Sequence, residues 1–179
     1  MKIEKTNFFP VEIHSFFVEK QTCEEILKIV KEEKDNWSKN LLNVKAKTSG
    51  WDGLTFPIIK DISNFCCETV LPKIHSLDNW SCEEAWVNVY EKGDYTEVHN
   101  HASKKYSAIL IVKSKCNALV FKNIANMYSL GNFKKEHQDE KILEKDGLFI
   151  FFPSWLFHYV EKCTDERITV AFNFYNEEY

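Results

Sequence analysis

The stretch GLFIFFPSWLFHYV, residues 147–160, decides the fold class of this 179-residue chain. Residues 147–152 are almost all apolar, and their aromatic and β-branched side chains are typical of a buried strand. Pro153 interrupts this run, and His158 follows five residues later at the start of a second short apolar segment. The stretch therefore predicts two strands joined by a turn, with a histidine where the second strand begins.

Segments of the same kind recur on both sides of this stretch. We predict strands over residues 85–90, 106–112, 118–122, 158–163 and 168–174. The N-terminal part begins with a short strand region in residues 1–20 and then takes on a helical period. One helix is expected to begin at a capping box formed by Thr22 and Glu25. A second helix covers about residues 57–70, and Pro72 is expected to end or kink it.

Helices followed by a run of strands predict a mainly β fold with N-terminal helices. We expect a double-stranded β-helix, also called a jelly roll, with the helices packed on its outer face. The length fits one domain over residues 1–179, in which residues 1–80 form a helical support and residues 81–179 form the β-helix core. Residues 123–140 are polar and poorly patterned, so we interpret them as a long loop and a candidate substrate lid.

Composition and charge limit the classes of function. The 23 Lys and Arg residues against 27 Asp and Glu give a formal net charge of −4, which argues against a surface devoted to nucleic acid. The N-terminus lacks the apolar core of a secretion signal, and no stretch has the length of a spanning helix. The six cysteines are scattered and predict reduced thiols. We therefore expect a cytoplasmic protein that does not contact a membrane.

Three of the six histidines lie where a metal site could form. His99 and His101 are two residues apart after a predicted strand, so on an extended segment both imidazoles point to the same side. His158 lies far along the chain, at a strand end that a jelly roll can bring beside this pair. Three neutral imidazoles suit Fe(II), Zn(II), Ni(II) or Cu(II). An isolated H-x-H pair is equally compatible with solvent-exposed polar residues, so the pattern around it carries the interpretation.

That pattern resembles the 2-oxoglutarate/Fe(II)-dependent oxygenase superfamily. It is most similar to a group of oxygenases common in bacteria and tailed phages, which implies a bacterial or phage-infected cell as the place of action. The resemblance covers about residues 84–175. It rests on Asn88-x-Tyr90-x-x-Gly93-x-Tyr95, His99-x-His101, Ser107, Gly147, Phe152-Pro153-Ser154-Trp155-Leu156-x-His158-x-Val160, Arg167-Ile168-Thr169 and Phe172-Asn173.

The resemblance implies an oxidative hydroxylase in which His99, His101 and His158 bind Fe(II). O2 and 2-oxoglutarate would be the cosubstrates, and the substrate would be a small molecule or a peptidyl side chain. Most members of the superfamily carry H-x-D or H-x-E as the first pair, which gives two histidines and one carboxylate. This chain has His101 at the second position, and a neutral third ligand leaves the iron with one more unit of positive charge.

The resemblance also implies an anchor for the far carboxylate of 2-oxoglutarate. Arg167 is the only arginine in the chain, and a guanidinium gives a carboxylate two parallel charge-assisted hydrogen bonds. Thr169 projects to the same face of a strand and would donate a hydroxyl hydrogen bond. A surface salt bridge with Asp165 or Glu166 is the alternative role for Arg167. Three further residues would line the cosubstrate pocket, with a purely structural place in a strand as their alternative: Asn88, Tyr90 and Ser107.

Two other functions fit parts of the pattern. The glycine, histidine and proline spacings also resemble the metal motifs of the cupins, which would make the protein a three-histidine metal-binding cupin. A cupin would carry a glutamate four or five residues after His101, where this chain has Lys105 and Tyr106, and it would give no role to Arg167. The other alternative is a non-catalytic jelly-roll binding or structural module, in which aromatic residues such as Trp155 form a binding surface.

Overall fold

Antiparallel β-strands are the main secondary structure in the described residues. The computed structural model describes residues 3–8, 11–39, 41–101, 103–123 and 139–177. The strands are β1 (Glu4–Phe8), β2 (Val11–Phe17), β3 (Ser38–Lys39), β4 (Val44–Lys45), β5 (Lys47–Thr48), β6 (Trp80–Tyr90), β7 (Tyr95–His99), β8 (Tyr106–Ser114), β9 (Leu119–Phe121), β10 (Glu140–Lys141), β11 (Leu148–Pro153), β12 (His158–Val160) and β13 (Arg167–Asn176). The helices are α1 (Lys20–Glu33), α2 (Pro57–Phe65) and α3 (Leu71–His75), with a 3-10 turn at Gly53–Thr55 and a π-helical turn at Cys66–Val70.

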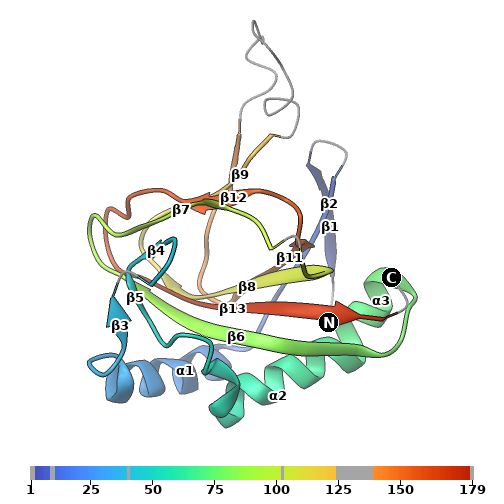
Figure 1. Cartoon of the computed structure of the whole chain (residues 1–179), viewed down its shortest axis with the longest axis horizontal. Coiled ribbons are helices and arrows are strands. Elements are labelled where there is room, and N and C mark those ends of the chain that lie inside the picture. The colour runs from blue at the N-terminus through green and yellow to red at the C-terminus, as the bar shows by residue number, and fades with distance from the viewer. Residues whose placement is uncertain (1–2, 9–10, 40, 102, 124–138, 178–179) are drawn as a thin grey trace, which may run out of the picture.

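The strands form two sheets that face each other (Figure 1). Within the described residues, the large sheet has the order β1-β2-β11-β8-β13-β6-β5-β3 and the small sheet the order β10-β9-β12-β7-β4. Helices α1 and α2 cover the outer face of the large sheet, on the side away from the small sheet (Figure 1). This arrangement confirms the predicted mainly β architecture with N-terminal helices.

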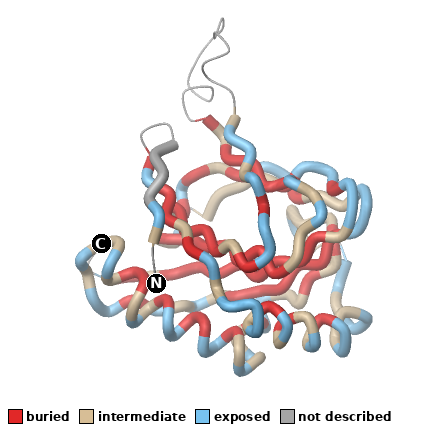
Figure 2. Tube along the Cα trace, turned by 180° about the vertical axis from the view of Figure 1, so that it is seen from behind, coloured by how far each residue is buried: buried red, intermediate tan, exposed pale blue. Residues whose placement is uncertain are grey.

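The alternation of side chains along the large sheet creates two separate interiors. On β13, Ile168, Val170 and Phe172 belong to the core beneath the helices, whereas Arg167 and Thr169 line the space between the sheets. Strands β6, β8 and β11 alternate in the same way, because successive residues of a strand point to opposite faces. Buried residues therefore run almost without interruption along most of β8, β11 and β13 and along the second half of β6 (Figure 2).

Helix α1 begins three residues earlier than the capping box predicts. Glu19 is the N-cap, and its side chain makes no capping hydrogen bond. The expected capping box of Thr22 and Glu25 is therefore wrong, because both residues already lie inside the helix. The apolar face of α1 places Ile26 and Val30 in the core under the large sheet, so packing of this face stabilises the helix in place of a side-chain cap.

The second predicted helix continues past Pro72 instead of ending there. Helix α2 passes into the π-helical turn at Cys66–Val70 and then into α3, where Pro72 occupies the first turn. A proline lacks a backbone N–H and crowds the carbonyl four residues before it. The wider π turn accommodates this, and the helical segment ends only at Ser76, whose φ of 53° is left-handed.

The other strand predictions hold within a few residues, and the structure adds β7 and several two-residue strands. The predicted strand over 158–163 is shorter and ends at Val160. The predicted strand region in residues 1–20 is confirmed as the hairpin of β1 and β2, which extends the large sheet next to β11. Residues 124–138 of the predicted loop lie outside the described residues. None of the helices in the described part of the chain is long and apolar enough to cross a membrane.

Candidate metal centre and cavity

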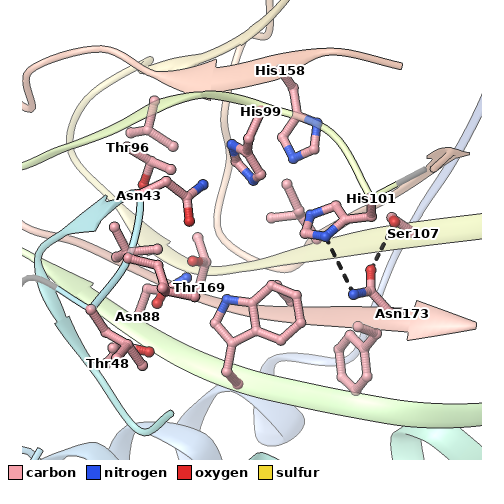
Figure 3. A pocket seen from close by; sticks show the side chains of 18 of the residues that line it. Asn43, Thr48, Asn88, Thr96, His99, His101, Ser107, His158, Thr169 and Asn173 are labelled. Atoms are coloured by element: carbon pink, nitrogen blue, oxygen red, sulfur yellow. Dashed lines mark hydrogen bonds between the residues drawn. The ribbon is translucent and has the colours of Figure 1, made fainter. Parts of the chain in front are cut away.

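Three imidazoles converge on one point between the two sheets (Figure 3). His99, His101 and His158 each offer a ring nitrogen, and these nitrogen atoms lie within 4.8 Å of one another. The ring centroids of His99 and His158 are 4.3 Å apart, and that of His101 lies 5.0 Å and 5.4 Å from them. The structure therefore brings together the three histidines that the sequence singled out.

Strand pairing and one turn fix the positions of these histidines. His99 ends β7 and His158 begins β12, and the antiparallel register places the two residues opposite each other. Just beyond β7, the backbone N–H of His101 donates to the carbonyl of Ser154 at 2.8 Å. Strand β7 follows β6 through a tight turn at Gly93, whose φ of 91° favours glycine.

Backbone carbonyls fix the orientation of two of the imidazoles. Nδ1 of His99 donates to the carbonyl oxygen of Glu97 at 2.8 Å, and Nδ1 of His158 donates to that of Leu156 at 3.0 Å. Because a carbonyl oxygen can only accept, Nδ1 carries the proton in both rings and Nε2 keeps its lone pair for a metal. The third ring, that of His101, has Nδ1 3.4 Å from the side-chain nitrogen of Asn173.

All three histidines have a pKa below the ordinary value. Burial is the main cause in each case, and it lowers the pKa of His99 and that of His158, the latter strongly. Burial, with the neighbouring His99 and Lys104, lowers the pKa of His101 to about 4. The imidazoles are therefore neutral at pH 7, which is the form that binds metal ions.

These pKa values predict that the metal-free protein is less stable in mild acid. In the unfolded chain, His101 gains a proton near pH 6.5, whereas in the folded chain it stays neutral until about pH 4. The unfolded state thus binds more protons, and the free energy of unfolding falls as the pH drops from 7 to 5, by about 2 kcal/mol from His101 alone. Urea denaturation at both pH values measures this, and His101→Gln should flatten the dependence. If the free energy of unfolding of His101→Gln falls as steeply between pH 7 and pH 5 as that of wild type, the prediction is wrong.

A cavity extends from the histidines between the two sheets. Its polar lining includes all of the predicted cosubstrate residues, and its apolar walls come from both sheets. The lining residues most relevant here are Asn88, Tyr90, Ser107, Arg167, Thr169, Asn173, Trp51, Trp86, Ile109, Phe152 and Val160. Asn88, Tyr90 and Ser107 therefore lie in the cavity wall, and they also have the structural place in a strand that was their alternative.

Arg167 is buried inside the cavity wall and does not form the surface salt bridge considered as its alternative role. Its side chain is 1% exposed, and its Nε donates to both carboxylate oxygens of Glu144, at 3.0 Å and 2.8 Å. The guanidinium also lies 5.0 Å from the centre of the Tyr90 ring. Burial is the largest influence and favours the neutral form, but Glu144 and Tyr90 together hold the pKa of Arg167 above its ordinary value.

A hydrogen-bond network lies behind the metal centre. The hydroxyl of Ser107 donates to Oδ1 of Asn173 at 2.8 Å, and it also contacts the hydroxyl of Ser154 at 2.8 Å. The amide nitrogen of Asn173 donates to Glu84 at 2.9 Å and faces His101 (Figure 3). These contacts fix the amide orientation of Asn173, because its oxygen faces a donor and its nitrogen faces a carboxylate.

Sequence reasoning missed two polar residues of the site. Asn173 was part of a recognised motif but had no assigned role, and its position six residues after Arg167 puts both on the same face of β13. Glu144 lies between β10 and β11, without a motif or a periodic pattern around it. No sequence signal identifies Glu144, because its partner is 23 residues away in the chain.

Comparisons with known proteins agree with this geometry. A family model described as "Putative 2OG-Fe(II) oxygenase" matches residues 84–173, which contain all three histidines and Arg167. No curated protein matches the chain by sequence.

Several solved structures share the fold. A prolyl-4-hydroxylase from Pseudomonas putida has a TM-score of 0.69 at 11% identity, with 92% of each chain covered. A prolyl hydroxylase from Trichoplax adhaerens, solved with a peptide of hypoxia inducible factor, has a TM-score of 0.68 at 13% identity, covering 93% of this chain and 84% of that one. The epimerase SnoN of nogalamycin biosynthesis has a TM-score of 0.69 at 8% identity, covering 92% and 78%. These likenesses confirm the double-stranded β-helix.

Proposed function

Because this chain belongs to the family of 2OG-Fe(II) oxygenases, we propose that its cavity binds Fe(II) and 2-oxoglutarate side by side and hydroxylates a substrate there. The observation that carries the proposal is the pairing of two features in one cavity. Three neutral imidazoles converge near one part of its wall, and a buried guanidinium with an unpaired nitrogen lies in another part. The three imidazoles can bind a metal ion, and the guanidinium can bind a carboxylate.

We assign the metal to His99, His101 and His158. Their donor set suits a divalent first-row metal, and the neutral state of the rings needs no proton release at pH 7. Fe(II) fits this donor set and is the metal of the family. When bound, Fe(II) would activate O2, and 2-oxoglutarate and the C–H bond of the substrate would each supply two of the four electrons that reduce it. One oxygen atom would enter succinate as CO2 leaves, and the other would enter the substrate.

We assign the far carboxylate of 2-oxoglutarate to Arg167. Nη2 of this guanidinium is buried and has no hydrogen-bond partner among the described residues. A buried donor without a partner costs about 1–3 kcal/mol, so an acceptor from the ligand relieves this cost. Thr169 lies two residues further on the same face of β13 and can donate its hydroxyl hydrogen. Oδ1 of Asn88 is also buried without a partner in this part of the structure.

In this proposal, the apolar walls of the cavity exclude water and admit the substrate. Trp86, Ile109 and Phe152 line the cavity near the histidines and keep bulk water from the metal. Trp51 stacks edge-on against Trp86 at 4.9 Å and is 50% exposed, so it lies where the cavity meets solvent. We place the entry of a small-molecule or peptidyl substrate at this edge. The free state of all six cysteines supports action in a reducing compartment such as a bacterial or phage-infected cytoplasm.

An anaerobic titration tests the proposal. Fe(II) added to metal-free protein, followed by 2-oxoglutarate, should produce a visible metal-to-ligand charge-transfer band. Arg167→Ala and Arg167→Lys should each need about 10- to 100-fold more 2-oxoglutarate to reach the same band, because either change removes the charge-assisted hydrogen bonds of the guanidinium. Arg167→Lys keeps a positive charge beside Glu144, so it controls for loss of the ion pair. Bound iron without a band would instead indicate a three-histidine cupin, and absence of iron binding would indicate a binding module.

A further inference from the structure

A buried ion pair forms part of the cavity wall. The side chains of Glu144 and Arg167 are 0% and 1% exposed. Oε1 of Glu144 also accepts the backbone N–H of Leu119 at 2.8 Å and that of Ala118 at 3.3 Å. The backbone N–H of Glu144 in turn donates to Oδ1 of Asn117 at 2.8 Å. Glu144 is therefore fixed to the start of β9 in the small sheet while it holds Arg167 of the large sheet.

The contacts of Glu144 determine which nitrogen atoms of the Arg167 guanidinium can still bind a ligand. Both hydrogen bonds of the pair come from Nε, so this nitrogen is occupied. Nη2 is left buried without a partner in the described structure. The ring of Tyr90 lies against the guanidinium and is itself held by a 2.8 Å hydrogen bond between its hydroxyl and that of Thr96. The side chain of Arg167 is thus oriented before any ligand binds.

The ion pair also sets the charge of this part of the cavity. A lone buried guanidinium would be strongly unfavourable, and the carboxylate of Glu144 makes the pair neutral as a whole. A ligand carboxylate at Nη2 therefore meets a hydrogen-bond donor whose positive charge is already offset. It also meets the repulsion of the Glu144 carboxylate, which is hydrogen-bonded to Nε of the same guanidinium.

We propose that Glu144 is a positioning residue that both orients Arg167 and limits its attraction for the far carboxylate of 2-oxoglutarate. The proposal rests on the function proposed above, in which Arg167 anchors that carboxylate. It assigns two opposite effects to one side chain. The hydrogen bonds of Glu144 favour cosubstrate binding, because they hold the guanidinium of Arg167 in one orientation in the cavity wall. The charge of Glu144 opposes cosubstrate binding, because it repels the ligand.

Two substitutions separate these effects. Glu144→Gln keeps an oxygen that can accept from Leu119 and from Nε of Arg167 but removes the charge, so 2-oxoglutarate should bind on the order of tenfold more tightly. Glu144→Ala removes both the charge and the hydrogen bonds that orient the guanidinium. In that variant, 2-oxoglutarate should bind at least about tenfold more weakly.

Calorimetric titration of the Fe(II)-loaded protein without oxygen measures these affinities. Each variant is titrated with 2-oxoglutarate and with 2-oxopentanoate, which has the same chain but lacks the far carboxylate. The affinity ratio of the two ligands should rise in Glu144→Gln and fall in Glu144→Ala. Glu166→Gln is the matched control, because Glu166 precedes Arg167 in the chain but pairs with Lys113 at the surface, and it should leave the ratio unchanged.

The outcomes distinguish this inference from the proposed function. Wild-type protein that binds both ligands equally would overturn the anchor role of Arg167 and this inference with it. Wild-type protein that prefers 2-oxoglutarate, with the same preference in Glu144→Gln, would leave the anchor intact and overturn the role of Glu144. A fall of the ratio in Glu144→Gln would also overturn it. If Glu144→Ala does not fold, the Gln variant decides alone.

Discussion

His99→Ala protein should bind Fe(II) at least about 100-fold more weakly than wild type and should lose 2-oxoglutarate turnover. Loss of a residue that merely supports a metal ligand already costs 10- to 100-fold in metal affinity, and loss of a ligand costs at least the upper end of that range. His99 is less buried than His158, so its removal leaves the core largely intact. Metal content after dialysis against Fe(II) or Mn(II), followed by titration, measures the effect.

His101→Asp should behave differently from His99→Ala. A carboxylate oxygen of aspartate reaches as far from the backbone as Nδ1 of histidine does. In wild type, Nδ1 of His101 lies 3.4 Å from the side-chain nitrogen of Asn173, which could then donate to this carboxylate. The variant would carry two histidines and one carboxylate, a ligand set that binds Fe(II). We expect retained metal binding, and complete loss of metal from this variant would contradict the expectation that a carboxylate can replace the imidazole of His101.

The residue pattern of this sequence predicts much of the fold and part of the candidate site. The aromatic and β-branched residues of 147–152 and 168–174 predicted strands, and β11 and β13 form there. One face of each strand packs under the helices and the other lines the cavity. The H-x-H spacing put two imidazoles on one side of an extended segment, which the structure shows. Their roles as metal ligands stay predictions.

The remaining features depend on contacts that no local pattern encodes. Glu144 gains its importance only because the loop before β11 meets β13 in space. The capping box at Thr22 and Glu25 failed because local capping competes with the packing of the apolar face of α1, and the packing sets where the helix begins. Pro72 does not end the helical segment, because the wider π turn before it accommodates a residue without a backbone N–H.

Phe149→Ala and Phe152→Ala should each lower the free energy of unfolding by about 3–5 kcal/mol, but only the second should disturb the metal centre. Both phenylalanines are fully buried on β11. Phe149 packs beneath the helices, where its ring lies 4.6 Å from that of Phe151. Phe152 faces the space between the sheets, where its ring lies 4.8 Å from that of His158. The two substitutions therefore make cavities of the same chemistry on opposite faces of one strand.

Urea denaturation of the metal-free variants measures stability, and titration with Fe(II) or Mn(II) measures the metal centre. Phe17→Ala is the matched control, because Phe17 is 56% exposed and its removal should change stability by no more than about 0.5 kcal/mol. Phe149→Ala protein that still folds should keep wild-type metal affinity, whereas Phe152→Ala should weaken it, since His158 loses the ring that holds its imidazole in place. Equal metal affinity in both variants would mean that backbone pairing of β12 and the hydrogen bond from Nδ1 orient His158 without help from the aromatic wall.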